Sequence, residues 1–166
     1  MPIVRLLGLA DAAAYQALRL DALARHPSAF RASFDEEAGQ TLDEFAARLA
    51  ADAIFGGFCD GALCGLAGLE IPQARHKRHK GTLFGVYVCP DRRRAGLGTA
   101  LVAAVIGHAR GRVDQLHAAV VTIADPARAL YRKLGFVPYG LEPRALKVGD
   151  QCLDQELLVL RLKGIG

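Results

Sequence analysis

A strand that runs through an arginine- and glycine-rich turn into a helix lies in the middle of the chain. Residues 81–88 read GTLFGVYV, a β-branched and aromatic pattern typical of a strand, and CPDRRRAGLG follows at 89–98. Apolar residues then recur four apart, at Leu97, Leu101 and Val105, which predicts a helix with one buried face. A strand that leads directly into a helix restricts the chain to an architecture that mixes the two.

The segments on either side of this unit alternate between strand-like and helix-like patterns of apolar residues. Single strands are expected at 3–7, 81–88 and 115–121. Two hairpins are also expected, one over 53–71 that turns at Asp60-Gly61 and a final one that turns at Gly149-Asp150. Helices are expected over 12–23, 41–53, 98–110 and 125–134. The resulting order, β-α-α-β-β-β-α-β-α-β-β, describes a single α/β (α+β) domain.

Two of these helices carry recognisable end signals. Thr41 and Glu44 have the spacing of a capping box, in which each side chain binds a free N–H group of the first turn. The last helix is expected to have Asp125 as its N-cap and Pro126 as its first residue, and to stop at Gly135.

Composition favours an ordinary globular protein. The chain has 166 residues, of which 52% are hydrophobic and 23% charged, and no apolar run is long enough to cross a membrane. Arg5 and Asp11 interrupt the apolar N-terminal run, so a cytoplasmic protein is expected. The four cysteines form no Cys-x-x-Cys pair, which predicts buried thiols and no metal site.

The turn between the central strand and helix has the features of an anion-binding site. A helix N-terminus carries about half a positive charge and several N–H groups without a partner, so it attracts phosphates. Gly96 and Gly98 have no side chains to keep a phosphate away from these amides, and the arginines at 92–94 add positive charge. A diphosphate fits this arrangement better than a neutral ligand does.

Two common nucleotide-binding motifs do not match this turn. A P-loop needs a lysine after its glycines, and none follows here. A dinucleotide fingerprint needs Gly or Ala three residues after Gly98, where this chain has Leu101. By itself, the turn is also compatible with a tight connection that carries solvated arginines.

Two motifs together resemble one known family. Arg93-x-x-Gly96-x-Gly98, preceded by VYVCPD, resembles the acetyl-CoA pyrophosphate loop of the GNAT superfamily of CoA-dependent N-acetyltransferases. ARALYRKLGF at 127–136 resembles the second signature of the same family, and LRLDALARHPSAF at 18–30 is similar to the acceptor-side helices of some bacterial members. The resemblance implies one N-acetyltransferase domain over residues 1–166, with a mixed, mostly antiparallel sheet of about six to seven strands and about four helices.

The resemblance also implies how acetyl-CoA binds. In this family the strand before the loop splays from its neighbour, so the backbone of 86–88 would bind the pantetheine arm like an added strand. The N–H groups of 93–99 would hold the pyrophosphate. The implied contacts to the cosubstrate are Val86, Tyr87, Val88, Arg93, Arg94, Ala95, Gly96, Leu97, Gly98, Thr99, Asp125, Ala127 and Tyr131.

Tyr131 matches the tyrosine that the family commonly uses as general acid toward the departing CoA thiolate. A tyrosine of pKa near 10 is protonated at neutral pH and can donate, although a ring packed into the core is the alternative role. Family members often carry an Asn seven residues before this tyrosine, and this chain has Ala124 there. Asp125 is the nearest polar substitute, unless it serves only as the helix cap.

The acceptor amine needs help to lose its proton, because an amine of pKa about 10.4 is almost fully protonated at pH 7. The strand at 82–88 has no acid, whereas many relatives place a carboxylate there. Glu70, at the end of the preceding strand, is the candidate base, and an ordinary solvent-facing role is its alternative. No cysteine matches a nucleophile of the family motif, so direct attack by the amine in a ternary complex is expected.

Two other functions compete with acetyl transfer. The run RHKRHK at 75–80 favours a small nucleic-acid-binding protein, but it lacks aromatic residues for base stacking and is more typical of a solvated hairpin loop. A non-catalytic acyl-CoA sensor would share the same cosubstrate site. The expected partners are acetyl-CoA and an amine acceptor, without nucleic acid or membrane; the acceptor's identity and a homodimer stay open.

Overall fold

In the computed structural model, which describes residues 2–163, seven strands form one sheet in the order β1-β2-β3-β4-β5-β7-β6. The strands are β1 (Ile3–Leu6), β2 (Ala53–Cys59), β3 (Ala62–Glu70), β4 (Lys80–Val88), β5 (Gln115–Val121), β6 (Val137–Val148) and β7 (Gln151–Arg161). The pair β4–β5 is parallel and the other neighbouring pairs are antiparallel. This confirms the expected mixed, mostly antiparallel sheet.

Five α-helices lie within the described range, one more than the sequence predicts. They are α1 (Ala12–Arg25), α2 (Phe34–Ala38), α3 (Leu42–Ala51), α4 (Leu97–Ala109) and α5 (Asp125–Lys133), with a 3₁₀ turn η2 (Pro27–Ala29) after α1. The additional helix is α2, which is too short to show a periodic pattern. It begins after Ser33, whose hydroxyl accepts a hydrogen bond from the N–H of Glu36 at 3.2 Å.

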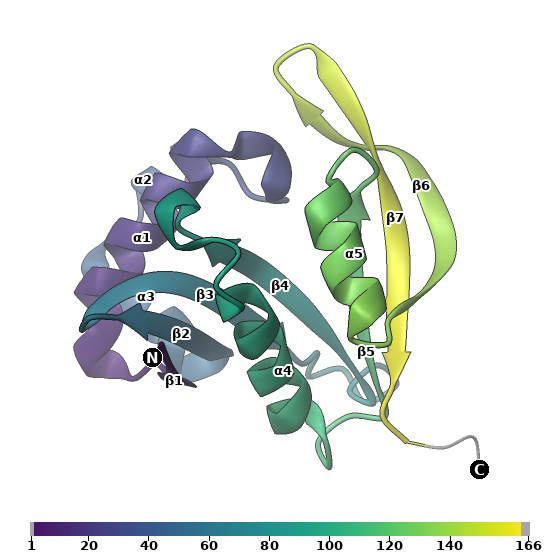
Figure 1. Cartoon of the computed structure of the whole chain (residues 1–166), viewed down its shortest axis with the longest axis horizontal. Helices are drawn as coiled ribbons and strands as arrows, with labels where there is room; N and C mark the ends of the chain where they lie inside the picture. Colours follow the sequence, from purple (N-terminus) through teal and green to yellow (C-terminus); the bar gives the residue numbers. More distant parts are fainter. Residues whose placement is uncertain (1, 164–166) are drawn as a thin grey trace.

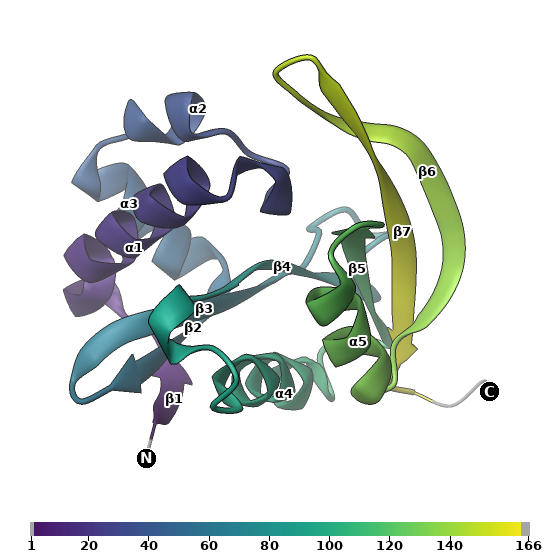
Figure 2. The same ribbon diagram turned by 45° about the horizontal axis from the view of Figure 1, so that its top comes forward.

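The helices cover the two faces of the sheet. Figure 2 shows α1, α2 and α3 on one side of β2–β4, and α4 on the other. On the α4 side, Leu97, Leu101 and Val105 are fully buried, which confirms the predicted apolar face of this helix. On the other side, the rings of Tyr15 and Phe45 meet edge to face in a second core.

Strands β4 and β5 separate soon after they meet. They pair only through Lys80–Thr82 of β4 and Gln115–His117 of β5, and then diverge in a V (Figure 1). One edge of β4 beyond Thr82 therefore has no strand from residues 2–163 beside it. This is the splay that the family resemblance implies.

A bulge bends β4 within this free stretch. The register against β3 shifts between Leu66 and Gly68, and Gly85 opposite has a φ of +63°. A non-glycine residue is strained at such an angle, so the glycine permits the bend. The bulge changes the direction of β4 three residues after its last pair with β5.

The helix-end predictions are confirmed at one helix and wrong in detail at another. Thr41 and Glu44 form the capping box, with bonds of 2.9 and 3.2 Å. At α5 the capping position is Ala124, and Asp125 is the first helical residue. The Asp125 carboxylate is 85% exposed and lies 3.5 Å from Arg128, because a side chain already inside the first turn turns toward the residue three positions on.

Both predicted hairpin turns are present. Asp60 and Gly61 both have positive φ, as a two-residue type I′ turn requires, and Gly149 has a φ of +60°. The basic run at 75–80 forms an exposed loop before β4, except that Lys80 opens the strand. No helix among residues 2–163 combines the length and apolar character needed to cross a membrane.

Candidate active site

The loop before α4 presents a row of backbone N–H groups. Within the described chain, the amides of residues 93–99 donate to no carbonyl or side chain, and the first bond of α4 runs from the Ala100 N–H to the Gly96 carbonyl at 3.0 Å. Gly96 caps the helix with a φ of +80° and no side chain. The free donors and the positive end of the helix dipole thus coincide, as an anion site requires.

The arginines of this loop have different tasks. Arg93 donates from Nε to the Val88 carbonyl at 2.9 Å, and its guanidinium lies 5.8 Å from the centre of the Tyr87 ring. Arg93 therefore fastens the loop to the end of β4. Arg94 has a φ of +67°, is exposed, and has no side-chain hydrogen bond within residues 2–163, so its charge is available to a ligand.

Gly98 stands where the loop, β4 and α5 meet. A Cβ atom at this position would lie 3.6 Å from Leu130 of α5 and 3.8 Å from Val88 of β4, which are ordinary contact distances. The two family signatures, far apart in the sequence, are therefore neighbours in space.

The β4 residues expected to bind pantetheine lie beyond the last β4–β5 pair. Val86 and Val88 pack against the core on the α4 side. Tyr87 points to the other face, where its ring is 6.3 Å from Phe30. The Val88 carbonyl accepts from Arg93, so a ligand would have to use the second lone pair of this oxygen.

Tyr131 is held by the end of its helix. The N–H of Phe136 bonds to the Tyr131 carbonyl and that of Gly135 to the Arg132 carbonyl, both at 3.0 Å, which is a Schellman motif. The Phe136 ring packs 5.7 Å from the Tyr131 ring. Burial raises the pKa of Tyr131 to about 12, so its hydroxyl is protonated throughout the physiological range.

Glu70 ends β3 and lies across from Thr82 of β4. Its carboxylate accepts a hydrogen bond from Arg31 at 2.6 Å, and the Arg31 guanidinium lies 5.6 Å from the ring centre of Phe84. Phe84 packs against the core on the α1 side, whereas Tyr131 belongs to the core on the α4 side. The candidate acid and base therefore belong to opposite faces of the sheet.

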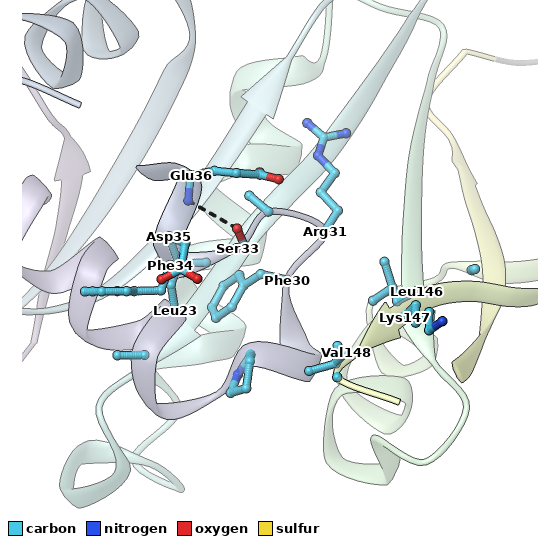
Figure 3. A pocket seen from close by; sticks show the side chains of 15 residues that line it. Leu23, Phe30, Arg31, Ser33, Phe34, Asp35, Glu36, Leu146, Lys147 and Val148 are labelled. Carbon is cyan, nitrogen blue, oxygen red and sulfur yellow. Dashed lines mark hydrogen bonds between the residues drawn. The ribbon is translucent and has the colours of Figure 1, made fainter. Parts of the chain in front are cut away.

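Three features escaped the sequence analysis. Arg31 is a single arginine in a connecting segment, with no pattern that marks it. Asp52 follows α3, and its burial, together with the charge of Glu70, raises its pKa. A cavity of about 630 Å³ lies between residues 23–36 and the β6–β7 turn at 145–149 (Figure 3). Contacts between segments so far apart give no local signal.

The other residues implied by the resemblance lie in the loop before α4 and in the helices α4 and α5. Leu97 is buried under the loop and Ala127 is packed against the α4 core, while Ala95 and Asp125 are exposed. Among residues 2–163, no three His, Cys, Asp or Glu side chains are grouped so as to hold a metal ion.

Comparison with known proteins identifies the family. The profile described as the acetyltransferase (GNAT) family matches residues 15–136, which include the loop and end at Phe136. No curated protein sequence matches the chain significantly.

Solved structures share the fold at low sequence identity. A GNAT-family acetyltransferase from Streptococcus pneumoniae superposes with a TM-score of 0.87 at 24% identity, over 98% of this chain and 99% of that one. The Salmonella typhimurium protein yncA, solved with its cofactor acetyl-CoA, gives 0.83 at 22% identity, over 100% and 96%. An N-acetyltransferase from Staphylococcus aureus Mu50 gives 0.83 at 20% identity, over 98% and 99%. With the family profile covering well over half of its length, this chain belongs to the GNAT family of acetyltransferases.

Proposed function

We propose that the protein transfers the acetyl group of acetyl-CoA to an amine acceptor, by direct attack of the amine within a ternary complex. The observation that carries this proposal is the row of free amides at 93–99, beside the unpaired edge of β4. The acetyl-CoA bound to the similarly folded Salmonella protein supports the choice of ligand. A cytoplasmic location stays a prediction from the sequence, and a homodimer stays open.

The residues present fit this cosubstrate. The amides of 93–99 and the Arg94 guanidinium would hold the pyrophosphate, since Gly96 and Gly98 leave the donors uncovered. The free edge of β4 at 86–88 would bind the pantetheine amides as a neighbouring strand does. When bound, acetyl-CoA supplies an acetyl thioester, whose carbonyl carbon is open to a nucleophile.

Tyr131 would serve the leaving sulfur as a hydrogen-bond donor. Complete proton transfer from a tyrosine of pKa about 12 to a thiolate whose acid has a pKa near 8.5 is uphill by roughly 5 kcal/mol in water. Stabilisation of the developing negative charge by the O–H group is therefore the main contribution expected of Tyr131.

Glu70 is the proposed acceptor of the proton on nitrogen. Freeing a primary amine from its proton at pH 7 costs roughly 4–5 kcal/mol, so a carboxylate close to the reacting nitrogen is needed, directly or through water. Glu70 takes this proton as the N–C bond forms and the C–S bond breaks. Glu70 lies across from Thr82, the last β4 residue that pairs with β5, where the V begins.

Titration of the purified protein with acetyl-CoA in a calorimeter tests the proposal, followed by an amine library assayed for thiol release. We expect saturable binding and release of free thiol with at least one amine. The absence of any saturation with acetyl-CoA would overturn the proposal. Saturation without transfer to any amine would favour the sensor, and salt-sensitive DNA binding without CoA affinity would favour the nucleic-acid-binding protein.

A further inference from the structure

The cavity between the helical segment and the β6–β7 turn has the size of a small-molecule site. Its volume of about 630 Å³ lies within the range of about 300–1,000 Å³ typical of such sites. Leu23 and Phe30 contribute apolar surface from one side, and Leu146 and Val148 from the hairpin (Figure 3). The cavity therefore offers room and apolar surface for a side chain of modest size.

Arg31 connects this cavity to the V between β4 and β5. It lines the cavity, yet its guanidinium reaches Glu70 at 2.6 Å and lies over the ring of Phe84. Phe84 comes two residues after Thr82, the last β4 residue that pairs with β5. The Arg31–Glu70 pair thus stands between the cavity and the free edge of β4.

Arg31 and Glu70 can each bind a ligand group in addition to each other. Their side chains are 59% and 44% exposed, and ion pairs this exposed contribute little to stability. Arg31 has five N–H donors and Glu70 two oxygens, and within residues 2–163 a single hydrogen bond joins them. A ligand with one negative and one positive group could therefore bind both at once.

We infer that the acceptor is a zwitterion, a free amino acid with an apolar side chain. Its carboxylate accepts from the remaining N–H groups of Arg31, whose planar fork suits a carboxylate. Its ammonium group donates to Glu70, which places the nitrogen beside the carboxylate that takes its proton. The apolar side chain occupies the cavity. This inference rests on the proposed function, since it names the acceptor of the same reaction.

The charges of the cavity favour a zwitterion over a polyamine. Arg31 and Lys147 line it from opposite walls, with Asp35 and Glu36 on the helical side. The two positive and two negative side chains give a polycation no net attraction, and an amine without a carboxylate would leave the Arg31 donors to water. The mixed charges match a ligand whose own charges cancel.

The test compares leucine, leucinamide, 3-methylbutylamine and spermidine as acceptors for the wild type and two variants. Arg31→Gln removes the carboxylate partner, and Arg25→Gln is the control, because Arg25 forms an exposed ion pair with Asp21 outside the cavity. We expect leucine to have the highest kcat/KM. Arg31→Gln should lower the value for leucine about 10- to 100-fold more than the value for 3-methylbutylamine, because only leucine loses a charge-assisted contact.

Equal losses for leucine and 3-methylbutylamine, or a wild-type preference for spermidine or leucinamide, would overturn the inference. Calorimetric titration of leucine into the protein saturated with CoA gives a readout that needs no turnover. Suppose that leucine binds, that Arg31→Gln abolishes this binding, and that no acetyl transfer occurs. This result would overturn the proposed function but leave the inferred recognition of leucine intact. Full acetyl-CoA binding with no leucine binding would overturn the inferred acceptor and leave the proposed function intact.

Discussion

Tyr131 shows how the end of a helix can fix one functional side chain. The residue lies two positions before Lys133, the last residue of α5, where the Schellman motif ties its carbonyl to Phe136 and the two rings pack at a tilt. The ring is buried, and the pKa of the hydroxyl is raised by this burial. The alternative core role and the acid role thus belong to different parts of the same side chain.

Replacing Tyr131 by Phe separates these two roles. Tyr131→Phe keeps the ring and its contact with Phe136, so thermal stability and acetyl-CoA affinity should stay close to those of the wild type. We expect kcat to fall by about 10²-fold, because the donor to the departing sulfur is lost. Steady-state thiol-release kinetics measure the effect, and a kcat within threefold of wild type would remove the assignment.

Gly96 and Gly98, both in the proposed phosphate-binding loop, allow a matched comparison of two Gly→Ala variants. Gly96 has a φ of +80°, so Gly96→Ala should cost about 1–2 kcal/mol of stability through backbone strain, although no atom of the described residues lies within 4 Å of the added Cβ. Gly98 is helical and its added Cβ would make ordinary contacts. Urea unfolding should show Gly98→Ala to be at least as stable as wild type, and a larger loss for Gly98→Ala than for Gly96→Ala would contradict this account.

At the scale of elements, a buried ion cluster joins the three N-terminal helices. Arg19 of α1 donates to Glu37 of α2 at 2.9 and 3.0 Å, and Arg48 of α3 donates to the same carboxylate at 2.8 Å. Arg19 and Glu37 are almost completely buried. These contacts position the short α2, and with it one wall of the cavity.

Removing the shared carboxylate should therefore loosen this side of the molecule. Glu37→Gln leaves Arg19 charged and buried without its ionic partner, and such changes typically cost about 3–5 kcal/mol. The exposed neighbour Glu36 provides the control, since Glu36→Gln should change stability by less than about 1 kcal/mol. Urea denaturation followed by circular dichroism measures both, and equal effects would refute a specific role for Glu37.

At the scale of the whole molecule, acid should destabilise the fold. The Arg5 hydrogen bond, with a second from the Gly8 N–H, lowers the pKa of Asp11 to about 2. Burial alone would raise the pKa of Glu37, but the hydrogen bonds from Arg19 and Arg48 outweigh it and lower this pKa. A carboxyl with a lowered folded pKa stabilises the protein above its unfolded pKa, near 4, and loses this contribution as the pH falls through its folded value.

The melting temperature should therefore fall steeply between pH 4 and pH 2. Asp11→Asn should flatten part of this fall, because that residue would no longer take up a proton on unfolding. Calorimetric scans at pH 7, 4, 3 and 2 provide the measurement. Identical pH profiles for the variant and the wild type would exclude Asp11 as a contributor.

The sequence predicts the elements of this fold better than the contacts between them. Strand β5 is found at the predicted 115–121, because its alternating apolar pattern is local, and the two signatures identify the family. The Arg31–Glu70 pair joins residues 39 positions apart, and no periodicity connects them. The cap of α5 shifted by one residue because proline at the second helical position suits the first turn as well.

The three-residue ladder between β4 and β5 has a consequence for the motions of the empty protein. Successive N–H groups of a regular strand point to opposite edges, so on each side of the bulge at Gly85 alternate amides of β4 bond to β3 while those between them face the V. Deuterium should therefore replace the amide protons that face the V within minutes and those bonded to β3 far more slowly. The fast-exchanging positions trace the surface along which a bound molecule would slow the exchange.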